Sequence, residues 1–276
     1  MEKEIKRYPF QIISSDILKI VAIVSMLIDH VAAGLIPFQY ATKVYPFGLD
    51  KDGLTMLYNV MRNIGRLAFP IFCFLLVEGF MYTRSRSKYL RNLLIFAFIS
   101  EIPFDLCLVD SYNVSFLTLS DIPGKMQDFM ADQNVYFTLA IGLIAIWVMD
   151  SFWKKVVPGY DVVLYGKLRN IAVITSVITI CAACAVAILL GTDYNFHGVL
   201  LISIFYLFRR FPILPEAAGY IEMMGLYREQ WALPSFILMI LYNGKRSMTL
   251  KRLKYFFYAF YPVHILIIYI IRCIIY

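Results

Sequence analysis

The chain has 276 residues, of which 61% are hydrophobic and only 16% are charged, and its mean hydropathy is +0.69. An ordinary soluble domain has ~45–50% apolar and ~25% charged residues, so this composition excludes a water-soluble domain of any size. The net charge of +7 comes from short basic clusters between apolar runs, which is typical of cytoplasmic loops and not of a nucleic-acid-binding surface. The five cysteines show no metal-ligand or disulfide spacing, so we expect no metal.

Nine apolar stretches follow one another along the chain. A hydrocarbon core takes ~20 apolar residues per helix, so the sequence predicts an all-α, polytopic membrane bundle of about eight or nine transmembrane helices. We expect one domain over residues 1–276. The stretches cover residues 16–37, 59–82, 89–109, 135–153, 170–191, 198–208, 213–227, 231–242 and 255–276.

The seventh and eighth stretches do not fit a simple crossing. The seventh contains Pro215, Glu216 and Glu222, and the eighth, residues 231–242, is too short to cross upright. They form either two crossings or a re-entrant hairpin buried in protein, and the second alternative leaves about seven crossing helices.

The distribution of lysine and arginine predicts the orientation, because these residues collect in cytoplasmic loops. The N-terminal tail and the segments 84–91, 154–169, 209–210 and 245–254 are basic, whereas the loop 105–134 carries five aspartates against one lysine. We therefore expect a multi-pass protein of the cell membrane, with its N-terminus in the cytoplasm and its C-terminus outside.

The first predicted helix contains three ionisable residues, Lys19, Asp29 and His30. An ionisable group at membrane depth costs several kcal/mol unless it is paired or hydrated, so each one is a candidate for function. Lys19 precedes His30 by eleven residues, which is three helical turns, so the two share a face and stand ~16 Å apart along the axis. Asp29 lies ~100° around the helix from His30 and needs another partner. His30 is the strongest single candidate.

The second and third predicted helices carry two further pairs. Arg62 and Arg66 lie one turn apart near the depth of His30, and Glu101 and Asp105 lie one turn apart at an outer helix end. Either arginine can be the partner of Asp29. Arg62 can instead extend to the membrane interface, and the two acidic residues can be interfacial.

Near the cytoplasmic end of the second helix, Glu78 precedes the basic run Arg84, Arg86 and Lys88. Glu78 either belongs to the site or pairs with Arg84 or Arg86. The basic run is suited to the arrival of an anionic substrate from the cytoplasm.

Two later segments add polar candidates. The outer turn before the sixth helix supplies Asp193, Tyr194 and His197, and the final helix contains Tyr261 and His264. Asp193 and His197 have an alternative role as interfacial or capping residues.

These residues occur within motifs that resemble the TraX family, membrane proteins associated with N-terminal acetylation of conjugative pilin. The resemblance covers nearly the whole chain, and the joint spacing of the motifs is more specific than any one of them. The motifs are LKIVAIVSMLIDH at 18–30, RNIGRLAFPIFCFLLVEGFMYTRSRSKYL at 62–90, ISEIPFD at 99–105, NVYFTLAIG at 134–142, DYNFHGVLLI at 193–202 and YPVHILII at 261–268.

The same motifs also look like the wider acyltransferase 3 group. In that group a basic residue precedes a first-helix histidine by eleven positions, an arginine precedes a Phe-Pro-Phe-like run, and the last helix carries Tyr-x-x-His. Here Lys19, His30, Arg66, Tyr261 and His264 match those positions. The group usually has arginine where this chain has Lys19, and the two side chains are not equivalent as anion ligands.

The resemblance implies transfer of an acetyl or other short acyl group from cytosolic acetyl-CoA or another acyl-CoA. The acceptor is a hydroxyl or amine at the membrane or its outer face, carried by a pilin, a glycan or a small molecule. The resemblance implies that His30 is the general base or nucleophile. Asp29 and Arg66 are the other expected catalytic residues, and Arg66 would stabilise the thioester oxyanion or hold a phosphate. The expected substrate-binding residues are Lys19, Arg62, Glu78, Arg84, Glu101, Asp105, Asp193, Tyr194, Tyr261 and His264.

Two other classes of function remain open from the sequence. Intramembrane acidic, basic and histidine side chains also build the proton relays of ion-coupled transporters. The chain lacks the paired repeats typical of many secondary transporters. A non-enzymatic membrane assembly partner is the third class, and it predicts that His30 and Arg66 can be replaced without effect.

Overall fold

Helices make up nearly all of the regular structure. The computed structural model describes residues 9–43, 46–109, 132–156, 166–245 and 254–275, and no strand occurs in that part of the chain. The α-helices are α1 (Ser15–Thr42), α2 (Lys51–Gly65), α3 (Ala68–Tyr82), α4 (Arg86–Phe104), α6 (Val135–Val156), α7 (Gly166–Leu189), α8 (Asn195–Phe208), α9 (Leu214–Met223), α10 (Leu233–Ile240) and α11 (Lys254–Ile275). The shorter elements are η1 (Pro46–Gly48), η2 (Asp105–Val109) and η4 (Glu229–Ala232).

Five segments of the described chain are helical, long and apolar enough to cross a membrane: Ser15–Tyr40, Lys51–Tyr82, Val135–Trp153, Asn170–Leu189 and Tyr255–Ile275. Helix α4 has 19 residues with basic side chains in its first turns, and α8 has only 14. The all-α membrane bundle is confirmed, and five of the eight or nine predicted helices meet these requirements.

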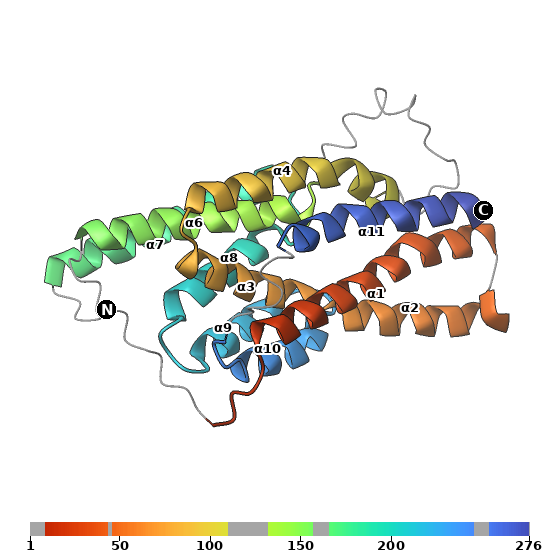
Figure 1. Cartoon of the computed structure of the whole chain (residues 1–276), viewed down its shortest axis with the longest axis horizontal. Helices are drawn as coiled ribbons and strands as arrows, with labels where there is room; N and C mark the ends of the chain where they lie inside the picture. The colour runs from red at the N-terminus through yellow and green to blue at the C-terminus, as the bar shows by residue number, and fades with distance from the viewer. Residues whose placement is uncertain (1–8, 44–45, 110–131, 157–165, 246–253, 276) are drawn as a thin grey trace.

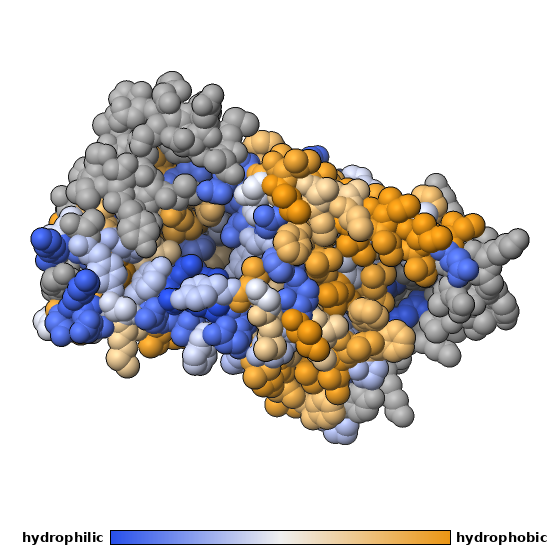
Figure 2. Space-filling view, turned by 180° about the vertical axis from the view of Figure 1, so that it is seen from behind, coloured by the Kyte–Doolittle hydropathy of each residue, from blue (hydrophilic) through white to orange (hydrophobic). Residues whose placement is uncertain are grey.

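The helices run mostly along the long axis of the molecule (Figure 1). The end of α1, the start of α2 and the C-terminal end of α11 lie together at one end, on the right in that view. Figure 2 shows apolar residues over the middle and right of the opposite face, and hydrophilic residues toward its left, the end where α2 begins. This division suits a protein that is partly in lipid and partly in water.

The second membrane helix is longer than predicted. It begins at Lys51 instead of residue 59, because Asp50 caps α2 by accepting a hydrogen bond from the Gly53 amide at 2.8 Å. Its first turns carry polar, exposed residues such as Lys51 and Asp52, so hydropathy alone places the start of the helix too late. Arg62 therefore lies in the last turn of α2, about midway along the segment Lys51–Tyr82, and not at the start of the second membrane helix.

Residues 209–243 form a re-entrant hairpin. Helices α9 and α10 have 10 and 8 residues, so neither can cross a hydrocarbon core. Both ends of the segment reach the last turns of α3: Tyr206 at the end of α8 packs on Phe80, and Tyr242 after α10 donates to Glu78. Its apex, Glu229, contacts Arg66 just before α3 begins. The hairpin thus extends along α3 for about 20 Å and returns to the side on which it started.

The acidic loop predicted on the outer side lies outside the described residues between 110 and 131. The basic segments that cover 157–165 and 246–253 are also outside them.

Candidate active site

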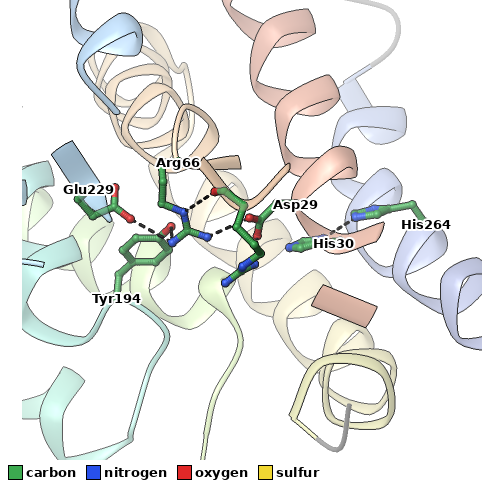
Figure 3. A network of polar contacts seen from close by, with 7 residues as sticks. Asp29, His30, Arg66, Tyr194, Glu229 and His264 are labelled. Atoms are coloured by element: carbon green, nitrogen blue, oxygen red, sulfur yellow. Dashed lines mark hydrogen bonds and ion pairs between the residues drawn. The ribbon is translucent and has the colours of Figure 1, made fainter. Parts of the chain in front are cut away.

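A buried ion-pair network joins α1 to α2. Asp29 is 7% exposed, and its two carboxylate oxygens accept from different arginines. Arg62 Nη1 lies 2.5 Å from Asp29 Oδ2, and Arg66 Nη2 lies 3.0 Å from Oδ1. Figure 3 shows Asp29 directed toward Arg66 while His30, the next residue, points toward His264. The prediction that Asp29 pairs with Arg62 or Arg66 and not with His30 is confirmed, and both arginines take part.

Most donors of Arg66 are already engaged by the protein. Its Nε donates to the Arg62 carbonyl at 3.2 Å, and its Nη1 donates to Glu229 at 3.1 Å and to the Tyr194 hydroxyl at 3.4 Å. With the bond to Asp29, four of the five guanidinium N–H groups have acceptors. In the described structure Arg66 can therefore offer a substrate one N–H, and not the two parallel N–H groups of a bidentate contact.

Glu229 is the member of this network that sequence reasoning missed. It is 1% exposed, lies in η4 and is separated from Arg66 by 163 residues. One signal was available: a carboxylate between two apolar segments that are each too short to span. The re-entrant hairpin places Glu229 opposite Asp29 across the Arg66 guanidinium (Figure 3).

Titration of Glu229 predicts a pH-dependent stability. Burial raises the pKa of Glu229 from its ordinary 4.5 to about 7, although Arg66 opposes the rise. The folded protein then binds this proton more tightly than the unfolded chain, so the free energy of unfolding decreases as pH rises from 4.5 through about 7. We expect the midpoint of thermal unfolding in detergent to fall over this range, and the fall to be smaller in Glu229→Gln. An equal fall in both proteins would show that another group is responsible.

The turn before α8 supplies Asp193 and Tyr194. Tyr194 and Asn195 both have positive φ, 60° and 47°, a conformation that non-glycine residues adopt at a cost. The Tyr194 ring stacks on Phe69 of α3 at 3.6 Å between centroids, which holds its hydroxyl toward Arg66. Burial raises the pKa of Asp193 to about 6, partly offset by Arg66. The turn therefore belongs to the site and is not simply interfacial.

His30 forms the second half of the site with His264 of α11. Their ring nitrogens, His30 Nδ1 and His264 Nε2, are 2.6 Å apart, and the ring planes differ by only 3°. The centroids are 4.9 Å apart, which exceeds the nitrogen distance by about two ring radii, so the rings meet edge to edge in one plane. This is the geometry of an N–H···N hydrogen bond.

The partners of the two rings determine where the protons lie. His264 Nδ1 is 2.5 Å from the carbonyl oxygen of Phe260, which can only accept, so Nδ1 carries the proton. In the neutral ring His264 Nε2 is then an acceptor, and His30 Nδ1 must donate to it. His30 Nε2 has no hydrogen-bond partner in the described part of the chain, so its lone pair is available. The Phe260 carbonyl thus selects, through two rings, the tautomer in which His30 can accept a proton from a substrate.

Tyr261 borders the histidine pair. Its ring lies 5.6 Å from that of His30 in an edge-to-face arrangement, and Tyr136 of α6 packs on it at 5.2 Å. Both tyrosines are buried. They form an apolar wall that limits how the His30 ring can rotate.

Three other predicted residues lie apart from this centre. Lys19 is 3.8 Å from Asp16 and lies over the ring of Phe257, close to the start of α1. Glu78 accepts from Tyr242 at 3.3 Å. Arg84 is exposed between α3 and α4.

Arg86 has a different partner from the one predicted. It pairs at 2.7 Å with Asp150, a fully buried residue of α6, and stacks on Phe80 at 4.2 Å. No contact between Arg86 and Glu78 appears among the hydrogen bonds and ion pairs of the described residues. Arg86 ties α4 to α6 at this end of the molecule.

Glu101 and Asp105 lie where α4 passes into η2. Glu101 accepts from the backbone amide and the side chain of Asn134. Asp105 is 3% exposed, and its Oδ1 has no hydrogen-bond partner among the described residues. In the described part of the chain, no three His, Cys, Asp or Glu side chains are grouped to hold a metal ion.

Gly65 allows the close approach of α1 and α2. A Cβ at this position would lie 2.1 Å from Asp29 Oδ1 and 2.4 Å from Asp29 Cβ. We expect Gly65→Ala to displace the carboxylate from both arginines, to lower the free energy of unfolding by ~1–3 kcal/mol and to reduce activity. Gly225→Ala is the matched control, because its nearest atom would be 3.4 Å away. Thermal unfolding of both variants tests this, and equal midpoints would contradict it.

The comparisons with known proteins agree with these motifs. The probable fimbrial assembly protein FimC, serogroup H1, of Dichelobacter nodosus is 29% identical over 269 residues, which cover 90% of this chain and 91% of that protein. No solved structure matches the chain. The family model described as TraX protein matches residues 14–272, which include every residue of the network and both histidines. The chain therefore belongs to the TraX family.

Proposed function

We propose that this protein is a membrane-embedded acyltransferase. It moves an acetyl or other short acyl group from cytosolic acyl-CoA to a hydroxyl or amine acceptor at the membrane or its outer face. The observation that supports this most is the His30–His264 pair, which leaves one His30 nitrogen with a free lone pair beside a buried network of charges. A nitrogen held in this way is suited to general-base catalysis.

In the proposed reaction, the acceptor oxygen or nitrogen attacks the thioester carbon while His30 Nε2 takes the acceptor proton. A C–O or C–N bond forms, the C–S bond breaks, and its electron pair leaves with the CoA sulfur. The proton then passes from His30 to that sulfur. Transient acylation of His30 Nε2 is the alternative route, in which the imidazole attacks first.

Arg66 contributes a fixed positive charge near the reacting atoms. Its contacts with Asp29 and Glu229 hold the guanidinium in place before substrate binds, so little reorganisation is needed as negative charge develops on the thioester oxygen. The one N–H without an acceptor among the described residues is available to that oxygen.

The acceptor is proposed from the comparisons. The relative from Dichelobacter nodosus is named for fimbrial assembly, and the resemblance to the TraX family implies acetylation of a pilin. A pilus subunit is therefore the first acceptor to test, followed by glycans and small hydroxyl or amine compounds.

The test uses purified protein in nanodiscs with acetyl-CoA and each acceptor, and measures release of the free CoA thiol. Release that depends on an acceptor supports the transferase. An ion-coupled transporter or an assembly partner releases no thiol, so absence of release with every acceptor rejects the proposal. Binding of acetyl-CoA is measured separately to show that the purified protein is intact.

Lys19 is proposed to contact the anionic part of acyl-CoA at the inner mouth, together with Arg84. We expect Lys19→Ala to raise the KM for acetyl-CoA about tenfold, because a hydrogen bond to a charged group contributes ~1.5–3 kcal/mol, and to leave kcat unchanged. Lys51→Ala, an exposed lysine at the start of α2, is the control. A lower kcat with an unchanged KM would reject the docking role.

A further inference from the structure

Arg228, which precedes Glu229 in the re-entrant hairpin, has a donor without an acceptor. Its Nη2 donates to Asn59 of α2 at 2.6 Å, whereas its Nη1 is buried and has no hydrogen-bond partner in the described part of the chain. A buried guanidinium N–H without an acceptor costs ~1–3 kcal/mol or more, so this position needs an explanation.

The surroundings of Arg228 differ from those of the other two arginines near it. Arg62 and Arg66 each pair with Asp29, but the contacts of Arg228 in the described residues include no carboxylate. The guanidinium lies 5.8 Å from the ring centre of Tyr58 and 5.1 Å from that of Tyr227. Cation–π contacts of this kind supply no hydrogen-bond acceptor, so the N–H groups stay available for an oxyanion.

A second arginine lies within reach of the same place. Asn59 and Arg62 are three residues apart on α2, so they share a face and Arg228 lies about one turn from Arg62. The Arg62 side chain is 24% exposed, and in the described structure its guanidinium uses only Nη1, toward Asp29. Two guanidinium groups with unused donors thus lie about one helical turn apart along α2, and one of them, Arg62, pairs with Asp29, the residue that precedes His30.

The backbone of Arg228 is also held in an unusual conformation. Its φ is 69°, a left-handed value that a residue with a long side chain rarely adopts. Burial of Glu229 against Arg66 on one side and the bond to Asn59 on the other keep it there. Tyr227, beside it, is 83% exposed, so this side of Arg228 borders the surface of the molecule.

We propose that Arg228, together with Arg62, binds an anionic group of the acceptor, a phosphate or a carboxylate, and so orients the acceptor toward His30. The acceptor role in this inference rests on the proposed function. Anion binding at Arg228 can be tested without acyl transfer. The acceptor, a pilus subunit included, then presents a phosphate or carboxylate to Arg228, and this anionic group belongs either to a lipid headgroup or to a molecule that is not a lipid.

The test measures binding of glycerol phosphate by phosphorus NMR or calorimetry, without acyl-CoA, to protein in phosphatidylcholine nanodiscs. We expect Arg228→Gln to weaken binding at least about tenfold, since one charge-assisted hydrogen bond is lost, and Lys51→Gln to bind as the wild type does. Arg228→Lys keeps the positive charge and replaces Arg228→Gln if the latter fails to fold; it is expected to weaken binding about threefold or more.

Equal affinity in wild type and the Arg228 variants, or an equal loss in Lys51→Gln, overturns the proposal. Nanodiscs that also contain phosphatidylglycerol separate the two sources. If phosphatidylglycerol weakens glycerol phosphate binding to the wild type but not to the Arg228 variants, the anion is a lipid headgroup. If phosphatidylglycerol does not weaken this binding, the anion belongs to a soluble molecule. Anion binding without any thiol release retains this subsite and rejects only the transferase.

Discussion

His30→Ala is expected to lose acyl transfer by at least about 10²–10⁴-fold, the usual contribution of a positioned general base. A chain of hydrogen bonds, through His264 to the Phe260 carbonyl, sets the tautomer of His30 and so leaves the lone pair on its Nε2. Acetyl-CoA binding should survive, because the proposed donor contacts at Lys19 and Arg84 lie elsewhere. Thiol release under saturating donor and acceptor measures the loss in kcat.

The chain offers a matched control for this variant. His197 of α8 bonds Glu222 of α9 at 2.6 Å and touches neither His30 nor His264. His197→Ala should keep transfer activity close to that of the wild type. If His30→Ala turns over normally, or if both variants lose activity equally, His30 is not the base.

Asp29→Asn is expected to lower stability the most. The change keeps the shape of the side chain but leaves Arg62 and Arg66 without the charge that both contact. Breaking a buried pair in this way costs ~3–5 kcal/mol, because a charge remains in a place with little water. The midpoint of thermal unfolding should fall by about 6–20 °C, at ~2–4 °C per kcal/mol for a large domain.

Asp52→Asn is the control for this second prediction. Asp52 is exposed and lies in the first turn of α2, whereas the arginine of α2 that contacts Asp29, Arg62, lies in its last turn. Its replacement should shift the midpoint by no more than about 1–2 °C. If Asp29→Asn shifts the midpoint of thermal unfolding no more than Asp52→Asn does, then water, and not Asp29, compensates the positive charges of Arg62 and Arg66.

Part of the site could be predicted from the sequence because polar residues stand out within apolar runs. Asp29, His30 and Arg66 were candidates for this reason, and the structure brings the three together. Tyr261 and His264 entered through the resemblance of their motif, but nothing in the spacing indicated that His264 would bond His30 across 234 residues.

Glu229 could not be predicted by the same reasoning. It lies among polar neighbours in a segment of weak hydropathy, where a carboxylate is typical of an exposed loop and does not indicate a buried site. Its role depends on a tertiary contact made by the hairpin, and hydropathy predicts the length of an element and not its partners. Arg62 was misplaced for a related reason: the polar first turns of α2 hid the true start of the helix.

The re-entrant hairpin also has a consequence for the order in which the protein is made. A chain is synthesised from its N-terminus, so α1, α2 and α3 are in place well before residue 229 is translated. During that interval the cluster of Asp29, Arg62 and Arg66 carries one uncompensated positive charge. Insertion of the hairpin then brings a second acidic side chain, Glu229, to Arg66. Completion of the site is therefore a late step of biogenesis, because a nascent chain that ends after α8 still lacks both Glu229 and His264.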